Sequence, residues 1–469
     1  MNKLNELTLR QTLDALKHKE INLGELYNAL DVQVAAKNKE LNVFLTLNDH
    51  AKEEALAITQ KTSLENEKTP LAGIPLAVKD NFATKGMRTT ASSTVLDTFI
   101  PQYDSTVTRK LKAAGAIIQG KTNMDAWAHG SSTETSQYGR TLNPRNSDYL
   151  PGGSSGGGAA AIAADMSIAS IGSETAGSIR LPAAWCGVVG LKPTYGRVSR
   201  QGVVAMASST DSPGPITKTV EDSALLLELM AGHDPYDGTT SPQAVPAFSQ
   251  ALNKGIKGLR IGCIYMEYPE LQPIKAHYEA AFKVLEEAGA KVEMVQAMDP
   301  KYAISVYTVV QRGEVSSNLA RYDGIRYGND RSFFGEEAYR RIMLGTFTLS
   351  KGYADQYYNL AQKVRTQFIL DFERLFKTYD VLIAPTTPNF ALKVGASEES
   401  AMFGELMDVL VEASSIAGLP AISVPCYRDP ATNLFLGLNI MAPMWREDVC
   451  IQTAAAYEQA TTWNTWLNT

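Results

Sequence analysis

Residues 151–180 read PGGSSGGGAAAIAADMSIASIGSETAGSIR, and this stretch decides the fold class. Its first glycine- and serine-rich loop leads into small residues that predict a helix over 157–164. The apolar residues that follow predict a strand over 166–171, and a second glycine-rich loop, 172–180, comes directly after it. A loop, a helix, a strand and a loop in immediate succession are typical of α/β folds.

The same alternation continues outward in both directions. Apolar runs bounded by turn residues predict further strands over 71–78, 116–118, 259–263, 291–295 and 381–384, and helices over 105–114, 274–287 and 368–376. The segment 259–295 has the strand, helix, strand order of a βαβ unit. We therefore expect an α/β fold with a large mixed β-sheet flanked by helices on both faces.

Two helices are expected before this alternation begins. Thr8 and Gln11 have the spacing of a capping box at the start of the first helix. A second helix is expected from Asn22, because leucines follow it at helical intervals. These helices form a helical N-terminal prelude, and the polar run 60–70 is expected to be the loop that leads out of it.

The Pro- and Gly-rich stretch 234–246 is the clearest internal break in the chain. Strand-like runs resume after it, so we interpret it as a surface excursion of one large domain. The prediction is a single domain over 1–469. It consists of a helical N-terminal region (1–70), a core with the glycine-rich loops (71–230) and a remainder (259–469).

Composition restricts the possible functions. The 469 residues include 44 Lys and Arg against 50 Asp and Glu, a net charge of −6. A chain without an excess of basic residues cannot neutralise many phosphates by itself, so direct binding of nucleic acid is not expected. The shares of hydrophobic residues, 44%, and charged residues, 20%, are those of an ordinary globular protein.

Neither export, membrane insertion nor a zinc site is expected. The first twenty residues carry charges among their leucines, without the apolar core of a signal peptide. The apolar stretch 159–171 is too short to span a bilayer and contains Asp165. The four cysteines are widely separated in the sequence: Cys186, Cys263, Cys426 and Cys450. We therefore expect them to be structural thiols in a reducing cytoplasm.

Residues 115–122 match the Walker A pattern of nucleotide-binding loops letter for letter. A phosphate-binding loop follows a strand and opens a helix, whereas here a helix is expected before Gly115. The loop positions hold the apolar residues Ala116, Ile117 and Ile118, which predict a strand. Nucleotide binding at this segment is therefore not expected.

The two glycine-rich loops are better candidates for a functional site. Glycine lets the backbone approach a ligand closely. Free amides at a helix N-terminus stabilise negative charge, which suits an oxyanion as well as a phosphate. In one interpretation, Ser154, Ser155 and Ser178 only cap helices. In the other, one of these serines is a nucleophile and needs a base.

Two residues could serve as that base. Of the five histidines only His129 is close in sequence to the loops, and no Gly-x-Ser-x-Gly motif accompanies it. Lys79 ends the apolar run 71–78, where burial would disfavour the charged amine and lower its pKa from ~10.4 toward ~7–8. Viewed alone, Lys79 is more typical of a solvated lysine at a strand end.

Taken together, these residues resemble the amidase signature family of serine hydrolases. The matching segments are 73–80 (GIPLAVKD), 152–157 (GGSSGG) and 172–194, which ends in GVVGLKPT. The resemblance implies that Ser178 is the nucleophile, Ser154 a bridging serine that follows a cis peptide bond, and Lys79 the base. It also implies an oxyanion hole made by the backbone amides of Thr175, Ala176, Gly177 and Ser178.

Further segments narrow the resemblance to the A subunits of tRNA-dependent amidotransferases. They are 120–125, 130–134, 191–199, 214–222, 316–324, 340–345, 361–365 and 417–425. The resemblance implies a cytoplasmic glutaminase that forms an acyl-enzyme and passes ammonia to a B subunit, with a small C subunit completing a heterotrimer. The B subunit would use ATP and Mg to amidate Glu-tRNA(Gln) or Asp-tRNA(Asn). This chain would need no cofactor, metal or membrane, and would meet mischarged tRNA only through the complex.

Free glutamine has two charged α-groups that such an enzyme must bind. By resemblance, Arg341 binds the α-carboxylate and Asp408 the α-amino group, and these charge-assisted pairs explain a preference for an amino acid. His129, Gly130 and Ser131 are expected to belong to the same substrate-binding pocket. The chain departs from the family pattern at Trp127, His129, Glu174, Ala176, Leu181 and the residues before Asp408.

Two other functions stay open at this point. The chain could be a stand-alone amidase that acts on another small amide, or an inactive scaffold within an amidotransferase complex. Glutamine hydrolysis with and without partner proteins separates the first possibility from a glutaminase that works within a complex. Replacement of Ser178 by Ala tests the second, because an inactive scaffold would have no glutamate release for this change to abolish.

Overall fold

The structure is a computed structural model, and it describes residues 3–61, 66, 68–264, 268–325, 328–400 and 402–463. A single mixed sheet of eleven strands runs through these residues, in the order β1-β3-β2-β4-β6-β5-β10-β11-β9-β7-β8. Among the described helices, none combines the length and the apolar character that crossing a membrane would require.

The strands come from nearly the whole length of the chain. β2 is parallel to both β3 and β4, and β7 is parallel to both β8 and β9, whereas the other neighbouring strands are antiparallel. The strands are β1 (Phe44–Leu47), β2 (Pro75–Lys79), β3 (Ile117–Thr122), β4 (Ala169–Glu174), β5 (Val189–Lys192), β6 (Ser212–Thr217), β7 (Arg260–Ile264), β8 (Lys291–Val295), β9 (Val381–Pro385), β10 (Ala421–Arg428) and β11 (Phe435–Met441).

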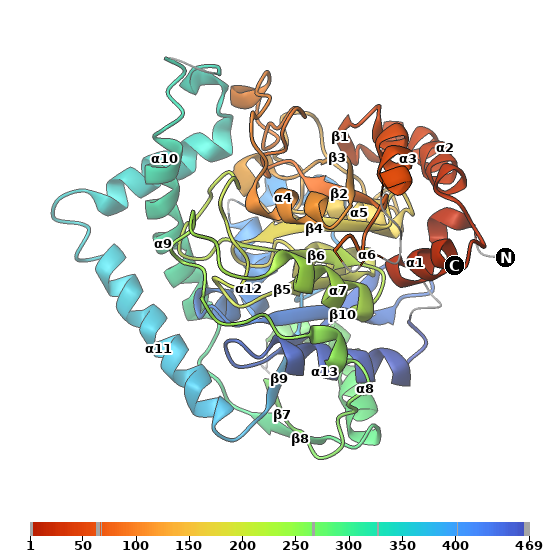
Figure 1. Cartoon of the computed structure of the whole chain (residues 1–469). Helices are drawn as coiled ribbons and strands as arrows, with labels where there is room; N and C mark the ends of the chain where they lie inside the picture. The colour runs from red at the N-terminus through yellow and green to blue at the C-terminus, as the bar shows by residue number, and fades with distance from the viewer. Residues whose placement is uncertain are drawn as a thin grey trace.

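Helices lie on both faces of this sheet (Figure 1). The α-helices are α1 (Leu9–Lys17), α2 (Leu23–Leu41), α3 (Ala51–Lys61), α4 (Thr106–Ala113), α5 (Gly156–Ala163), α6 (Arg180–Cys186), α7 (Val220–Met230), α8 (Lys275–Glu287), α9 (Lys301–Leu319), α10 (Glu336–Leu349), α11 (Tyr358–Phe376), α12 (Phe403–Ile416) and α13 (Glu447–Ala460). Short 3₁₀ helices are η1 (Leu4–Glu6), η2 (Thr94–Leu96), η3 (Ala126–Ala128), η4 (Phe248–Ala251), η5 (Pro269–Ile274), η6 (Arg331–Phe333) and η7 (Ala396–Glu399). The α/β fold with a mixed sheet and helices on both faces is confirmed.

Each face of the sheet has its own set of helices. α4, α7, α8 and α13 pack against one face, and α5 and α6 pack against the other. α9, α11 and α12 extend this second layer over β9 and β10. Figure 1 shows α9, α10 and α11 together at one end of the molecule, and α1, α2 and α3 together at the other.

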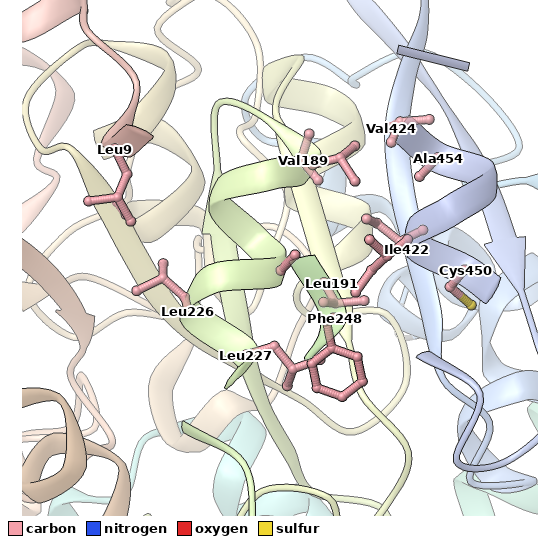
Figure 2. Packing of buried hydrophobic residues seen from close by; sticks show 14 of the residues in the cluster. Leu9, Val189, Leu191, Leu226, Leu227, Phe248, Ile422, Val424, Cys450 and Ala454 are labelled. Carbon is pink, nitrogen blue, oxygen red and sulfur yellow. The ribbon is translucent and has the colours of Figure 1, made fainter. Parts of the chain in front are cut away.

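Alternating side chains of the central strands build the main core. Val189 and Leu191 of β5, and Ile422 and Val424 of β10, point toward the face that α7 and α13 cover (Figure 2). All four are fully buried, and each such side chain contributes about 1.5–3 kcal/mol when it leaves water. This packing fixes the middle strands, and the glycine-rich loops extend from strands and helices that are anchored to them.

The opposite face admits α5 because the helix begins with glycines. A Cβ atom on Gly157 would lie 2.4 Å from the carbonyl oxygen of Asn123, and one on Gly158 would lie 2.8 Å from Ser170 Oγ. Larger residues would therefore lift α5 away from the sheet. The loop that precedes the helix would move with it.

The N-terminal prelude forms as the sequence predicts. Thr8 and Gln11 make a capping box at α1, and Asn22 caps α2 through its side chain. The carboxylate of Asp222 in α7 accepts hydrogen bonds from the backbone of Leu9 and Arg10, at 3.0 and 2.9 Å. The prelude is therefore attached to the core through the first turn of α1.

Most of the other predicted elements are present, several with different ends. The predicted helices 105–114, 157–164 and 274–287 correspond closely to α4, α5 and α8, and β7 and β8 form the expected parallel βαβ unit. The predicted helix 368–376 is only the second half of α11. The stretch 234–246 contains no helix or strand, as expected of a loop excursion.

Three predicted strands differ at their ends. The strand predicted over 71–78 begins only at Pro75, because Gly73 turns the chain with a φ of 80°. The strand predicted over 166–171 lies at β4, after a turn in which Asp165 has a φ of 56°. The strand predicted over 116–118 continues as β3 to Thr122, through residues that are not apolar.

Many elements have no counterpart in the sequence prediction: the strands β1, β5, β6, β10 and β11, and the helices α3, α7, α9, α10, α12 and α13. β1 has only four residues, and the end of α3 occupies the beginning of the polar run 60–70, for which a loop is predicted. Residues 62–65 and 67 of that run lie outside the described residues.

Candidate active site

Lys79 and Ser154 meet at the end of strand β2. Lys79 is the last residue of β2, and its Nζ donates hydrogen bonds to Ser154 Oγ at 2.8 Å and to the carbonyl oxygen of Ser173 at 2.9 Å. Ser154 lies in the glycine-rich loop before α5, and the Gly153–Ser154 peptide bond is cis, as expected. The structure thus brings together two groups that are 75 residues apart in the sequence.

Lys79 has no contact with solvent. Its side chain is fully buried, and this burial lowers the pKa of the amine to about 7, although the nearby Asp125, Asp211 and Glu174 act in the opposite direction. An amine with this pKa is partly neutral at physiological pH, so it can accept a proton. The solvated strand-end lysine is therefore the wrong interpretation of this residue.

Ser178 lies beside the Ser154 loop, in the turn between β4 and α6. The backbone N–H of Ser155 donates a hydrogen bond to the carbonyl oxygen of Ser178 at 3.1 Å, which joins the two glycine-rich loops. Ser178 is almost completely buried. Within the described residues, no hydrogen bond joins the hydroxyl groups of Ser154 and Ser178 directly.

The turn at Ser178 presents free backbone amides. The N–H groups of Ala176, Gly177 and Ser178 have no hydrogen-bond partner in the part of the chain that the structure describes. Buried amides are normally paired, so these three are available for an acceptor such as a developing oxyanion. Thr175 contributes its side chain to the same place, where its Oγ1 lies 3.0 Å from the hydroxyl of Tyr307.

A buried ion pair holds this turn in shape. Glu174 Oε1 accepts a hydrogen bond from Arg180 Nε at 2.9 Å, and Glu174 Oε2 accepts from the backbone N–H groups of Ile179 and Arg180 at 3.0 and 3.1 Å. Both side chains of the pair are fully buried. Arg180 also donates to the carbonyl oxygen of Ala176 at 2.9 Å, which fixes the orientation of that peptide group.

Ser178 opens into a small pocket. Its walls include five of the residues predicted for the site, and they bring opposite charges close to the serine. The lining residues are Ala128, Gly130, Ser131, Ser178, Met206, Tyr307, Arg341, Gly404, Glu405 and Asp408.

Asp408 lies directly against the turn at Ser178. A Cβ atom on Gly177 would be 2.1 Å from Asp408 Oδ1, so only glycine permits this approach. Ser131 Oγ donates to Asp408 Oδ2 at 2.8 Å, whereas the buried Oδ1 has no donor among the described residues. Burial raises the pKa of this carboxyl well above its usual range, and a cationic group beside Oδ1 would favour the ionised form.

Arg341 approaches the pocket from α10. Its Nε donates to Glu337 Oε1 at 2.5 Å, and its Nη2 lies 3.9 Å from Glu405 Oε1. Burial alone would lower the pKa of the guanidinium, but Glu405 and Glu337 outweigh it, so the pKa is raised and the group stays charged. A permanent cation therefore lies in the same pocket as Ser178 and Asp408.

His129 is placed differently from the other predicted residues. It is fully buried and is not part of the pocket lining, although its neighbours Ala128 and Gly130 are. Neither ring nitrogen has a hydrogen-bond partner in the described part of the chain. Burial, together with the positive charges of Arg341 and Arg312, lowers the pKa of the ring well below its usual value. A neutral imidazole behind the pocket wall is the result.

The Walker-like segment has a structural role. Gly120 and Lys121 lie within β3, so they do not form a phosphate-binding loop. Lys121 Nζ donates to the carbonyl oxygen of Phe82 at 2.6 Å and to Thr89 Oγ1 at 2.8 Å. These bonds fix the segment that follows Lys79. In the described residues, no group of three or more His, Cys, Asp or Glu side chains has the arrangement of a metal site.

Comparison with known proteins shows the family of this chain. The family model described as Amidase matches residues 25–451 of the chain. This chain belongs to the amidase signature family. Members of this family are enzymes, and Lys79, Ser154 and Ser178 all lie within the matched residues.

Three known proteins show how this amidase signature chain is related to others. The glutamyl-tRNA(Gln) amidotransferase A subunit of Halothermothrix orenii is 47% identical, over 97% of this chain and 98% of its own. The crystal structure of the protein of the same name from Thermotoga maritima has a TM-score of 0.83 at 37% identity, covering 97% of this chain and 95% of its own. The peptide amidase of Stenotrophomonas maltophilia has a TM-score of 0.84 at 29% identity, covering 97% of this chain and 96% of its own.

Several residues of this amidase signature site were not predicted from the sequence. Tyr307, Met206 and Glu405 line the pocket, and Arg180 holds the turn at Ser178. Arg180 is the last residue of the predicted loop 172–180, so its charge close to Glu174 is the one local signal of this ion pair. The others come from distant segments with no local signal.

Proposed function

We propose that the chain is the ammonia-producing A subunit of a tRNA-dependent amidotransferase. One observation carries the proposal: Ser178, the cation of Arg341 and the carboxyl group of Asp408 line the same small pocket. Free glutamine has a side-chain amide, an α-carboxylate and an α-amino group. The pocket has one group of suitable chemistry for each, and charge-assisted pairs of this kind favour an amino acid over a bare amide.

The chemistry follows from the positions of Lys79, Ser154 and Ser178. Neutral Lys79 accepts a proton from Ser154, which takes one from Ser178 as Ser178 Oγ attacks the amide carbon. The free amides of Ala176, Gly177 and Ser178, with the amide of Thr175 that the family resemblance adds, stabilise the oxyanion. The proton then passes back to the leaving nitrogen, ammonia departs, and water hydrolyses the glutamyl ester on Ser178.

The relay requires one movement within the site. Lys79 and Ser154 are already hydrogen-bonded, whereas Ser154 and Ser178 are not within the described residues. The proposal therefore needs the two hydroxyl groups to come within hydrogen-bond distance, and rotation of the serine side chains about χ1 is the movement we propose. The carbonyl oxygen of Ser173 holds Lys79 Nζ in place meanwhile, at 2.9 Å.

Partner proteins complete the proposed activity. The curated relatives are named as the A subunit of an amidotransferase, which implies further subunits in those proteins. For this chain we infer a cytoplasmic heterotrimer with a B and a C subunit. ATP and Mg act at the B subunit, which amidates Glu-tRNA(Gln) or Asp-tRNA(Asn). The chain itself uses no cofactor or metal, and mischarged tRNA meets it only through the complex.

A stand-alone amidase is the second candidate. The similarity of the fold to that of a peptide amidase favours it, because the two chains superpose over nearly their whole length. The presence of both Arg341 and Asp408 in one pocket favours glutamine instead. A plain amide has neither an α-carboxylate for Arg341 nor an α-amino group for Asp408.

The purified chain, with and without co-expressed B and C subunits, tests the proposal. We expect glutamate release from glutamine that the partners enhance, and little turnover of alkyl or aryl amides. Replacement of Ser178 by Ala should lower glutamate release by at least ~10³-fold. Rapid hydrolysis of plain amides without partner-enhanced glutaminase activity would contradict the proposal, and unchanged release from Ser178→Ala would contradict the choice of nucleophile.

A further inference from the structure

Two arginines face the same oxygen atom of Glu405. Arg312 of α9 donates from Nη2 to Glu405 Oε1 at 3.1 Å, and Arg341 Nη2 lies 3.9 Å from that oxygen. All three side chains are almost completely buried. Three helices, α9, α10 and α12, therefore meet in one arrangement of two cations around a single carboxylate oxygen.

The two arginines have different surroundings. Arg341 and Glu405 line the pocket of Ser178, whereas Arg312 lies outside the lining. Arg312 makes one side-chain hydrogen bond, to Glu405, and its buried Nε has no partner in the described residues. Arg341 in contrast is held at Nε by Glu337. Among the described residues, the hydrogen bond of the Arg312 side chain to the pocket lining is therefore the one to Glu405.

Glu405 would compete with a substrate for Arg341. A carboxylate in a water-poor pocket pairs strongly with a nearby cation, and leaving a buried charge without a partner is costly. Without Arg312, the remaining described cation within ion-pair distance of Glu405 is Arg341. The guanidinium of Arg341 would then pair with Glu405, and it would be less available to a substrate carboxylate.

We propose that Arg312 is a positioning residue that determines substrate selectivity. Because Arg312 pairs with Glu405, Arg341 remains available to bind the carboxylate of the substrate. The enzyme therefore favours amino-acid amides over plain amides. The inference rests on the proposed function, because it needs a substrate that has a carboxylate as well as the reacting amide.

Steady-state kinetics of the complete complex test this role. In Arg312→Met we expect the KM for glutamine to rise about tenfold while kcat stays within about twofold, since only uniform binding is lost. The KM for butyramide, which lacks both α-groups, should not change. Arg312→Lys keeps the charge and should recover most of the loss. Arg374→Met, which removes an exposed α11 arginine paired with Asp371, is the matched control.

A double variant distinguishes positioning from simple packing. In Arg312→Met/Glu405→Gln the competing charge is absent, so the KM for glutamine should return to within about threefold of the wild-type value. Arg312→Gln, which also removes the charge, serves as the test if Arg312→Met does not fold. An unchanged KM in the charge-removing variant, equal losses for glutamine and butyramide, or a double variant that keeps the raised KM would each overturn the inference.

The result also separates this inference from the proposed function. A wild-type complex without glutaminase activity contradicts both. A wild-type complex that hydrolyses glutamine, with an Arg312→Met KM equal to its own, contradicts only the role of Arg312.

Discussion

Lys79 and Ser178 differ in what holds them in place. Lys79 is fixed by two acceptors, Ser154 Oγ and the carbonyl oxygen of Ser173, and is sealed from solvent. Ser178 is held through its backbone, by the turn around it. The proposed base is therefore fixed before substrate binds, whereas the side chain of the proposed nucleophile has no hydrogen bond that fixes it in the described residues.

The ionisation of Lys79 should govern the pH dependence of catalysis. The protonated amine cannot accept a proton, so kcat/KM for glutamine should rise with pH and level off above the pKa of about 7. Lys79→Met should lose about 10²–10⁴-fold in rate, and its residual activity should show no inflection near that pH. Initial rates measured in overlapping buffers check this. A wild-type profile that is flat through neutral pH would show that another group is the base.

Gly177 should be intolerant of even a methyl group. In Gly177→Ala the added Cβ would overlap Asp408 Oδ1, which lies 2.1 Å from its position. We expect Asp408 to move away and the KM for glutamine to rise at least about tenfold, which isothermal titration with the Ser178→Ala background can confirm as weaker binding. Gly238→Ala is the control, because nothing lies within 4 Å of its Cβ position. Equal affinities in the two variants would contradict the close contact.

At this scale, the sequence identified the residues that stand in local motifs. Lys79, Ser154 and Ser178 could be found because each lies in a short glycine-rich or apolar segment with its own pattern. Arg312 and Glu405 could not, because their pairing joins positions 93 residues apart and each alone resembles a surface charge. The catalytic and substrate-binding roles themselves stay predictions.

The turn between β4 and α6 is held by the buried ion pair of Glu174 and Arg180. Glu174 accepts from Arg180 and from two backbone amides, and both charges are fully buried. Glu174→Gln should therefore lower the free energy of unfolding by about 3–5 kcal/mol, because the arginine is left without its counter-charge. Urea denaturation followed by circular dichroism measures this.

The matched control for this prediction is an exposed pair. Asp448→Asn, which removes the partner of Arg446 at the surface, should cost less than about 1 kcal/mol. A similar cost for the two variants would show that the buried pair does not stabilise the turn.

Element boundaries show what sequence patterns do not determine. The starts of α1 and α2 are predicted well because capping residues mark them. The prediction for β3 is too short because its last residues, including Lys121, are polar yet buried by tertiary contacts. Periodicity records the burial of apolar side chains, so it misses strands that bury polar ones.

On the scale of the whole molecule, the prelude and the sheet share one core. Leu9 of α1 is fully buried in the cluster that contains Leu226, Val189 and Ile422 (Figure 2). Leu9→Ala should lower the free energy of unfolding by about 2–5 kcal/mol. The loss of glutaminase activity in urea should then coincide with the loss of circular dichroism signal, as in a two-state transition.

Separate transitions would contradict that prediction. They would indicate that residues 1–70 unfold apart from the rest. The division of the single domain into the regions 1–70, 71–230 and 259–469 remains a prediction. Strands from both later regions belong to one sheet, in which β5 of the first region pairs with β10 of the second. No local pattern in the sequence indicates such a pairing.

The sealed position of Lys79 makes it a reporter of opening. A neutral amine reacts with small acylating reagents near neutral pH, whereas solvent-exposed lysines there are mostly protonated and react slowly. Reagent can reach the Lys79 amine only when the wall around it separates. The labelling rate of Lys79, measured by mass spectrometry, would therefore report how often the site opens. A bound ligand in the pocket should lower that rate.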